Sequence, residues 1–234
     1  MNKYTDIVKK IHNSPFKITF VSSGGGTNAI SSLLEVPGAS NTILESYIPY
    51  SKDSMDKFLN RKPDHYCSLD TCLSMGANAY KKSKEIDTKT KSKYLLGLSI
   101  TANLATTYEK KGDHKFFIVI QANDYTTYLE CFLEKGKRSR NEEEELITAC
   151  AISLLAESCG LEYPLPDQAE NINIEKIIAE KPWKKLFNNK VGFISNNKSN
   201  PELIFPGSFN PLHEGHIKMK ELAERKTGMH TTFE

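Results

Sequence analysis

The sequence lacks the features of a membrane-spanning, secreted or strongly charged protein. No run approaches the roughly 18 apolar residues of a membrane helix, and the N-terminus has no signal-type apolar stretch. The five cysteines are odd in number and spread along the chain, which suits a reducing compartment better than a disulfide framework. Because 31 basic and 29 acidic residues nearly cancel, no overall field attracts nucleic acid or an anionic membrane. We therefore expect a cytoplasmic protein with no membrane and no nucleic-acid partner.

A first glycine-rich turn follows an apolar, β-branched segment, residues 16–21, that is typical of a central strand. The turn reads Ser22-Ser23-Gly24-Gly25-Gly26-Thr27, and a helix through Ile30 and Leu33 comes after it. It lacks the lysine of a phosphate-binding P-loop, which excludes a Walker-type NTPase. A strand, a glycine turn and a helix start still direct free backbone N–H groups at an anion or a carboxamide. We expect a ligand to bind there.

Strands and helices alternate along the chain as far as Ser158. The expected strands are 16–21, 43–50, 95–100, 115–121 and 125–133, and the expected helices include 3–12, 69–80 and 142–158. This alternation predicts an α/β fold, with the first domain a three-layer α/β domain.

The composition changes after Glu162, where a polar stretch rich in Asn and Lys begins. We interpret residues 164–200 as a connector that contains a short helix over 172–178. The expected organisation is therefore a first domain over residues 1–163, this connector, and the start of a second domain over 201–234.

A second glycine turn follows the short apolar strand 203–205. Pro206 and Gly207 end the strand, and the segment from His213 to Glu224 is typical of a helix. His213 and His216 are three residues apart, so both side chains lie on one helix face and can reach one phosphate.

This second stretch resembles the nucleotide-binding motif of the cytidylyltransferase-like nucleotidyltransferases. Both halves of the motif are intact, and they read Gly207-Ser208-Phe209-Asn210-Pro211 and His213-Glu214-Gly215-His216. The resemblance implies a Rossmann-like domain that grips the triphosphate of ATP or CTP, with Mg²⁺, and stabilises charge as pyrophosphate leaves. It assigns catalysis to His213 and His216, and nucleotide binding to Gly207, Ser208, Phe209, Asn210 and Gly215. Because such a domain needs on the order of 100–150 residues, we expect a truncated domain whose acceptor-binding residues lie beyond Glu234.

The first domain resembles the C-terminal domain of CinA, the nicotinamide-nucleotide amidase family. The resemblance runs from about Phe16 to about Leu155, and three segments carry it: Ser23-Gly24-Gly25-Gly26, Leu34-Glu35-Val36-Pro37-Gly38-Ala39-Ser40, and Tyr50-Ser51. It implies a homo-oligomer with a pocket for a pyridine nucleotide. The residues that it assigns to ligand binding are Gly24, Gly25, Gly26, Thr27, Thr101 and Arg140.

The same resemblance implies amidase chemistry by a serine nucleophile, with a tyrosine and a lysine for proton transfer. The serine falls on Ser23 and the tyrosine on Tyr50, but the lysine falls on Met55, which can neither accept nor donate a proton. Lys52, one turn earlier, is the possible substitute. Gly24 and Gly25 also stand where the family has Cys and Thr.

Three functions stay open at this point. The first is a nucleotidyltransferase whose CinA-like domain has lost its chemistry and binds a ligand, and the second is a nicotinamide-nucleotide amidase with Ser23 as nucleophile. The third is a non-catalytic domain for oligomerisation or ligand binding. The basic run 135–140 is followed directly by Glu142–Glu145, so local charge pairing argues against a nucleic-acid surface there. We expect no metal site, and we expect His12, His65 and His114 to be solvated.

Overall fold

The structure is a computed structural model that describes the chain except for residues 1, 109, 168–170, 195–201, 210 and 234. The chain forms two compact units, Met1–Glu180 and Lys181–Glu234. Each unit is described by itself below.

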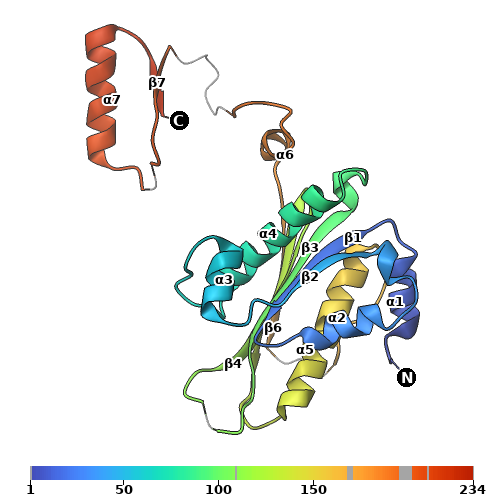
Figure 1. Ribbon diagram of the computed structural model, residues 1–234. Coiled ribbons are helices and arrows are strands. Elements are labelled where there is room, and N and C mark those ends of the chain that lie inside the picture. Colours follow the sequence, from blue (N-terminus) through green and yellow to red (C-terminus); the bar gives the residue numbers. More distant parts are fainter. Residues whose placement is uncertain (1, 109, 168–170, 195–201, 210, 234) are drawn as a thin grey trace. The chain divides into compact units, whose positions relative to one another are not determined.

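A mixed six-stranded sheet organises the first unit (Figure 1). Its strands lie in the order β2-β1-β3-β4-β5-β6. Strand β1 is parallel to both of its neighbours, β2 and β3, whereas each adjacent pair from β3 to β6 is antiparallel. The bounds are β1 Lys17–Ser23, β2 Ile43–Tyr47, β3 Leu95–Asn103, β4 His114–Gln121, β5 Tyr125–Leu133 and β6 Ile172–Ile178.

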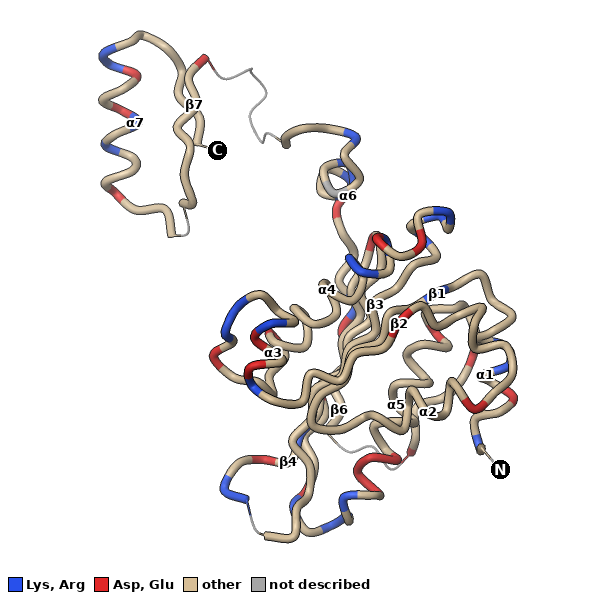
Figure 2. The backbone as a smooth tube through the Cα atoms, viewed as in Figure 1, with Lys and Arg blue, Asp and Glu red and all other residues tan. Residues whose placement is uncertain are grey.

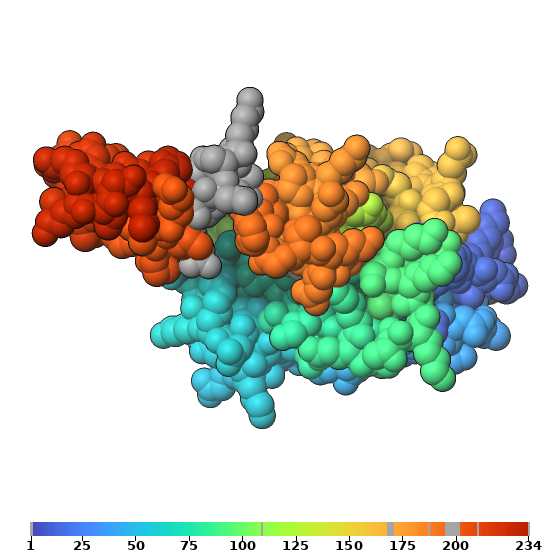
Figure 3. All heavy atoms as spheres, turned by 90° about the horizontal axis from the view of Figure 1, so that it is seen from above, coloured from blue at the N-terminus to red at the C-terminus, as the bar shows by residue number. Residues whose placement is uncertain are grey.

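Helices cover both faces of this sheet, which makes the predicted three-layer α/β fold (Figure 1). One layer contains α1 (Thr5–His12), α2 (Thr27–Leu34) and α5 (Arg140–Ser158). The other contains α3 (Lys52–Leu59) and α4 (Leu69–Ile86), whose outer side is the cyan to green surface of Figure 3. Two 3-10 turns, Ala39–Asn41 and Ser92–Tyr94, complete the described elements of this unit.

The apolar strands of the sequence form the centre of the core. Every residue of β3 except Asn103 is buried, and so is the run Phe116–Ile120 in β4. Helix α4 packs very closely on β3 at Gly97, where a Cβ atom would lie 2.3 Å from the carbonyl oxygen of Gly76. Because neither glycine has a side chain, the backbone of α4 lies directly on the sheet at this point.

Two expectations about this unit are wrong. Residues 172–178 form strand β6 and not a helix, because all seven pair with β5 from Tyr125 to Cys131 and complete the sheet. His12 and His114 are 2% and 7% exposed instead of solvated. The ring of His12 bonds Thr42 Oγ1 and the Leu33 carbonyl, each at 2.9 Å, so its polar atoms are satisfied inside the protein.

The second unit contains α6 (Lys181–Phe187) and a β–α–β motif of β7 (Leu203–Phe205), α7 (Glu214–Thr227) and β8 (Thr231–Phe233). Strands β7 and β8 are parallel, with Phe205 opposite Phe233. Among the described residues of this unit, Thr231 is the only buried one, and the apolar side chains of Ile217, Met219 and Leu222 on α7 are each more than 40% exposed. The described residues of the motif therefore form no hydrophobic core of their own.

No helix in the described part of the chain combines the length and the apolar character required to cross a membrane.

Candidate functional site

The first candidate site lies where the strand order reverses in the first unit. Strand β1 connects to β2 through α2 on one face of the sheet, and β2 connects to β3 through α3 and α4 on the other face. Ligands of open α/β sheets bind at the carboxyl ends of strands beside such a switch point. Ser23 and Thr101 are paired in register at these ends of β1 and β3, so the fold brings two of the predicted site residues together.

The glycine turn after β1 has the tight geometry that the sequence suggests. Gly24 and Gly26 have φ values of 79° and 87°, in the left-handed region, and Gly26 is the N-cap of α2. A Cβ atom on Gly24 would lie 2.0 Å from the carbonyl oxygen of Ala102, so no side chain fits there. The turn therefore lies directly against β3 and presents the N-terminus of α2.

A carboxylate of the protein itself occupies this helix N-terminus. Glu144, on α5, accepts the backbone N–H of Gly26 at 2.8 Å and that of Asn28 at 3.1 Å. Its Oε1 also lies 3.3 Å from the hydroxyl of Thr27. These are the N–H groups and the position that an anionic ligand would use.

Arg140 closes the same turn from the start of α5. Its guanidinium donates to the carbonyl oxygens of Gly24 at 3.1 Å and Ala105 at 3.2 Å. Arg140 thus holds the glycine turn against the loop after β3, and two of its N–H groups are already used within the protein.

Ser23 has no general base among its hydrogen-bond partners in the described structure. Its hydroxyl donates to the carbonyl oxygen of Pro49 at 3.0 Å, and a carbonyl cannot remove a proton.

The side chain of Tyr50 is 72% exposed. The amine of Lys52 lies 5.7 Å from the centre of the Tyr66 ring, and the hydroxyl of Thr101 donates to the Tyr66 carbonyl at 3.0 Å.

The second candidate site is the turn between β7 and α7. Gly207 and Ser208 are exposed, and Asn210 lies outside the described residues. Phe209 turns inward, with its ring centre 5.5 Å from that of Phe205 and 4.6 Å from that of Phe233. The aromatic residue of the motif therefore fixes the turn to both strands.

His213 and His216 lie together at the N-terminus of α7. Their rings are stacked, with centres 3.6 Å apart. His213 is the N-cap, and its Nδ1 accepts the N–H of Gly215 at 3.1 Å, while His216 Nδ1 lies 3.4 Å from the backbone nitrogen of His213. The two imidazoles thus occupy the positions at a helix N-terminus that suit an anion.

Glu143 and Glu144 were not predicted as site residues, because the run Glu142–Glu145 was interpreted as pairing with the basic run before it. Glu142 caps its own helix, in a capping box with Ser139. Successive residues of a helix point about 100° apart, so Glu143 and Glu144 reach different neighbours of α5. Nothing in the spacing identifies those neighbours.

The described residues hold no group of three His, Cys, Asp or Glu side chains arranged for a metal ion. The described thiols do not suggest one either, since burial raises the pKa values of Cys72 and Cys150 to about 12 and keeps both protonated at neutral pH.

Known structures with the same fold are members of the CinA superfamily. The competence/damage inducible protein CihA from Agrobacterium tumefaciens aligns with a TM-score of 0.54 at 15% identity, over 66% of this chain and 94% of its own. A CinA superfamily protein from Enterobacter cloacae also gives 0.54, at 11% identity over 67% and 91%. A competence or damage-inducible protein from Enterobacter asburiae gives 0.53, at 12% identity over 67% and 97%.

No protein-family model and no curated protein matches the sequence. At these identities the likeness establishes a CinA-like fold and nothing finer.

Proposed function

We propose that this chain is part of a nucleotidyltransferase-family protein, in which the second unit binds the triphosphate of ATP or CTP. The observation that carries the proposal is the parallel β7–α7–β8 motif, with the two stacked histidines at the start of α7. The CinA-like unit is then a ligand-binding or assembly module.

The chemistry of the turn fits a polyphosphate. A phosphate oxygen could replace His213 Nδ1 as the acceptor of the Gly215 N–H, and the released imidazole could then bind the phosphate. Since the described residues form no metal-holding group, the Mg²⁺ implied by the resemblance would be held mainly by the phosphate oxygens.

Nuclear magnetic resonance of the histidine side chains tests the proposal on the whole chain. Titration with MgATP or MgCTP should shift the ring signals of His213 and His216 along one saturable curve. His230 is the matched control, because it lies in the same unit but pairs with Glu224 at the far end of α7. His216→Ala should weaken binding about tenfold, as expected for loss of a charge-assisted contact. Equal shifts at His230, or no shift at either residue, would contradict the proposal.

Amidase activity in the first unit is the second candidate function, and it is compatible with the CinA-like fold, but the contacts of Ser23 argue against it. We propose that the site around Ser23 does not hydrolyse nicotinamide mononucleotide, since Ser23 donates to a carbonyl and Glu144 fills the N-terminus of α2. Wild-type protein should release no ammonia from this nucleotide. Ammonia release that disappears in Ser23→Ala would instead establish the amidase.

Removal of Glu144 distinguishes two explanations for a lack of ligand binding: that Glu144 blocks the site, or that the site has no affinity for the ligand. Glu144→Ala frees the N–H groups of Gly26 and Asn28, so calorimetry should detect nicotinamide mononucleotide binding that wild type lacks. Glu145→Ala, which removes an equal charge from the next residue, should leave the wild-type result unchanged. Equal heats for the two variants would rule out Glu144 as the block.

A further inference from the structure

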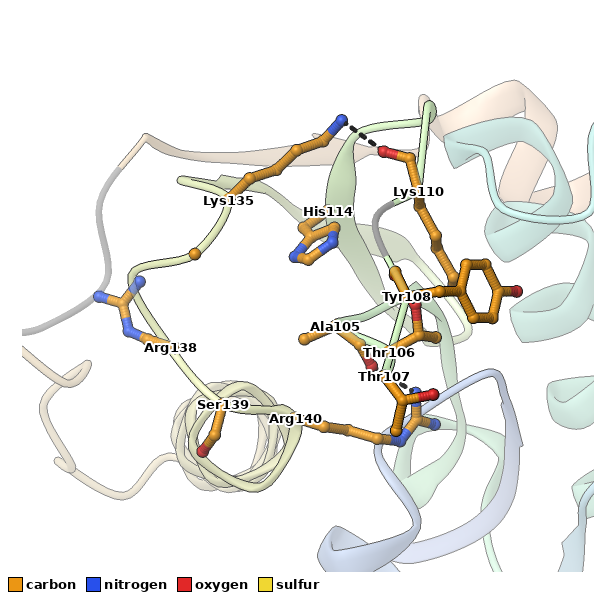
Figure 4. Close-up of a pocket in the computed structure, with 11 residues that line it drawn as sticks. Ala105, Thr106, Thr107, Tyr108, Lys110, His114, Lys135, Arg138, Ser139 and Arg140 are labelled. Atoms are coloured by element: carbon orange, nitrogen blue, oxygen red, sulfur yellow. Dashed lines mark hydrogen bonds between the residues drawn. The ribbon is translucent and has the colours of Figure 1, made fainter.

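A cavity in the first unit has Arg140 among its lining residues. It has a volume of about 630 Å³ and lies between the loop after β3 and the loop before α5 (Figure 4). This volume is in the range of small-molecule sites and far exceeds a single inorganic ion.

The lining of this cavity is strongly basic. Lys110, Lys135, Arg138 and Arg140 line it, and none of its described lining residues is acidic. Figure 2 shows Lys and Arg on both loops at this end of the sheet. Four cations around one concave surface create a local positive potential that the nearly neutral chain as a whole does not have.

The lysines already contact the protein, but only through uncharged acceptors. Lys135 Nζ donates to the carbonyl oxygens of Lys110 and Lys111 at 3.0 and 3.1 Å. Lys110 Nζ donates to the side-chain oxygen of Asn103 at 2.8 Å and the Leu104 carbonyl at 3.1 Å. These contacts fix the two ammonium groups at the cavity without cancelling their charge.

A buried imidazole provides the second observation. His114 lines the cavity although it is 7% exposed, and its Nδ1 lies 2.8 Å from Oε1 of the fully buried Glu143. The other oxygen of Glu143 accepts the N–H of Ala105 at 2.6 Å, so the carboxylate is held on both sides. His114 Nε2 makes no hydrogen bond to any described residue, and Figure 4 shows the ring among the lining residues.

We propose that this cavity binds a phosphate-bearing small molecule. The glutamate orients the ring through Nδ1, which leaves Nε2 as the ring atom available to hydrogen-bond a phosphate group. Lys110, Lys135 and Arg138 neutralise the remaining phosphate charge, which a monocarboxylate would leave unmatched. Tyr108, 67% exposed at the rim, offers a ring face to the organic part of the ligand.

The test titrates the whole chain with inorganic pyrophosphate and, separately, with ribose 5-phosphate, and follows the ring signal of His114. Both probes should produce a saturable shift. Lys135→Met and Arg138→Met should each raise the dissociation constant about tenfold, the usual size of one charge-assisted contact. Lys135→Arg, which keeps the charge, should retain most of the affinity.

Lys81→Met is the matched control, because Lys81 is an exposed lysine of α4 outside the cavity and its loss changes the net charge equally. An unshifted His114 signal at about 10 mM probe, or equal effects of Lys135→Met and Lys81→Met, would overturn the proposal. A melting temperature for each variant separates lost binding from a loosened loop. Signals of His213 and His216 report the nucleotide turn independently, so either proposal can fail alone.

Discussion

Gly24 shows how strongly one backbone position constrains the candidate pocket. Its left-handed φ and the 2.0 Å approach to the Ala102 oxygen act together, whereas Gly160 has a similar φ of 74° with nothing within 4 Å of a Cβ position. A comparison of alanine substitutions at these two glycines therefore distinguishes steric collision from backbone strain.

Gly24→Ala should lower the free energy of unfolding by at least about 2 kcal/mol, while Gly160→Ala should cost about 1 kcal/mol from the dihedral alone. Urea denaturation of both variants measures the difference. Equal losses would mean that β3 moves away from the turn at little cost.

His114 and Glu144 each depend on a single contact that the sequence does not show. The carboxylate of Glu144 accepts a backbone N–H group at the start of α2. The ring of His114 is oriented by its contact with the buried Glu143.

The end of α4 is fixed by one carboxylate at the scale of the element. Asp87 accepts the N–H groups of Lys89 and Thr90, and it pairs with Lys17 of β1 at 2.5 Å. The Lys17 ammonium, followed by the Thr90 contacts, holds the pKa of Asp87 well below its usual range. The folded-state pKa is therefore below the unfolded value, and ionised Asp87 stabilises the fold.

Asp87→Asn should lower the melting temperature at neutral pH, because the amide cannot pair with Lys17. The stabilisation by Asp87 is complete above the unfolded pKa of about 4 and is lost as pH falls through the lower folded pKa. The difference in melting temperature between wild type and variant should therefore decrease below about pH 4. Melting curves from pH 2 to 8 measure it, with exposed Asp64→Asn as control, and a gap that widens in acid would contradict this account.

Strand β6 is a single element on which the whole sheet of the first unit depends. It pairs with β5 from Tyr125 to Cys131, and Ile172 packs against the main core. A chain ending at residue 163 would leave β5 as an unprotected edge.

Residues 1–180 should therefore melt near the temperature of the first transition of the whole chain, and residues 1–163 should melt well below it or aggregate. Circular dichroism and light scattering compare the two. Equal melting of both shortened chains would support the boundary at residue 163 that the sequence suggested.

The whole molecule combines a CinA-like unit with a small parallel β–α–β motif. The first unit buries a large apolar core, whereas Thr231 is the only buried residue among those described in the second. The unfolding of the whole chain should therefore be dominated by the first unit.

The local sequence pattern was sufficient to predict many of the strands, turns and helices of this protein. The apolar strands 95–100 and 115–121, the two glycine turns and the helix after His213 all form as expected, because each is encoded by neighbouring residues. The three-layer α/β fold followed from the alternation of these elements. Ser23 and Thr101 could be placed at strand ends, but not next to each other, without the sheet order.

Tertiary structure alone decided what surrounds those turns. Residues 172–178 are a strand because β5 offers an open edge, and His114 is buried because Glu143 arrives from a helix 29 positions later in the chain. The carboxylate of Glu144 reaches the N–H of Gly26 across 118 positions. Sequence determines which backbone groups are free to bind an anion, whereas packing determines whether a ligand or the protein's own carboxylate reaches them.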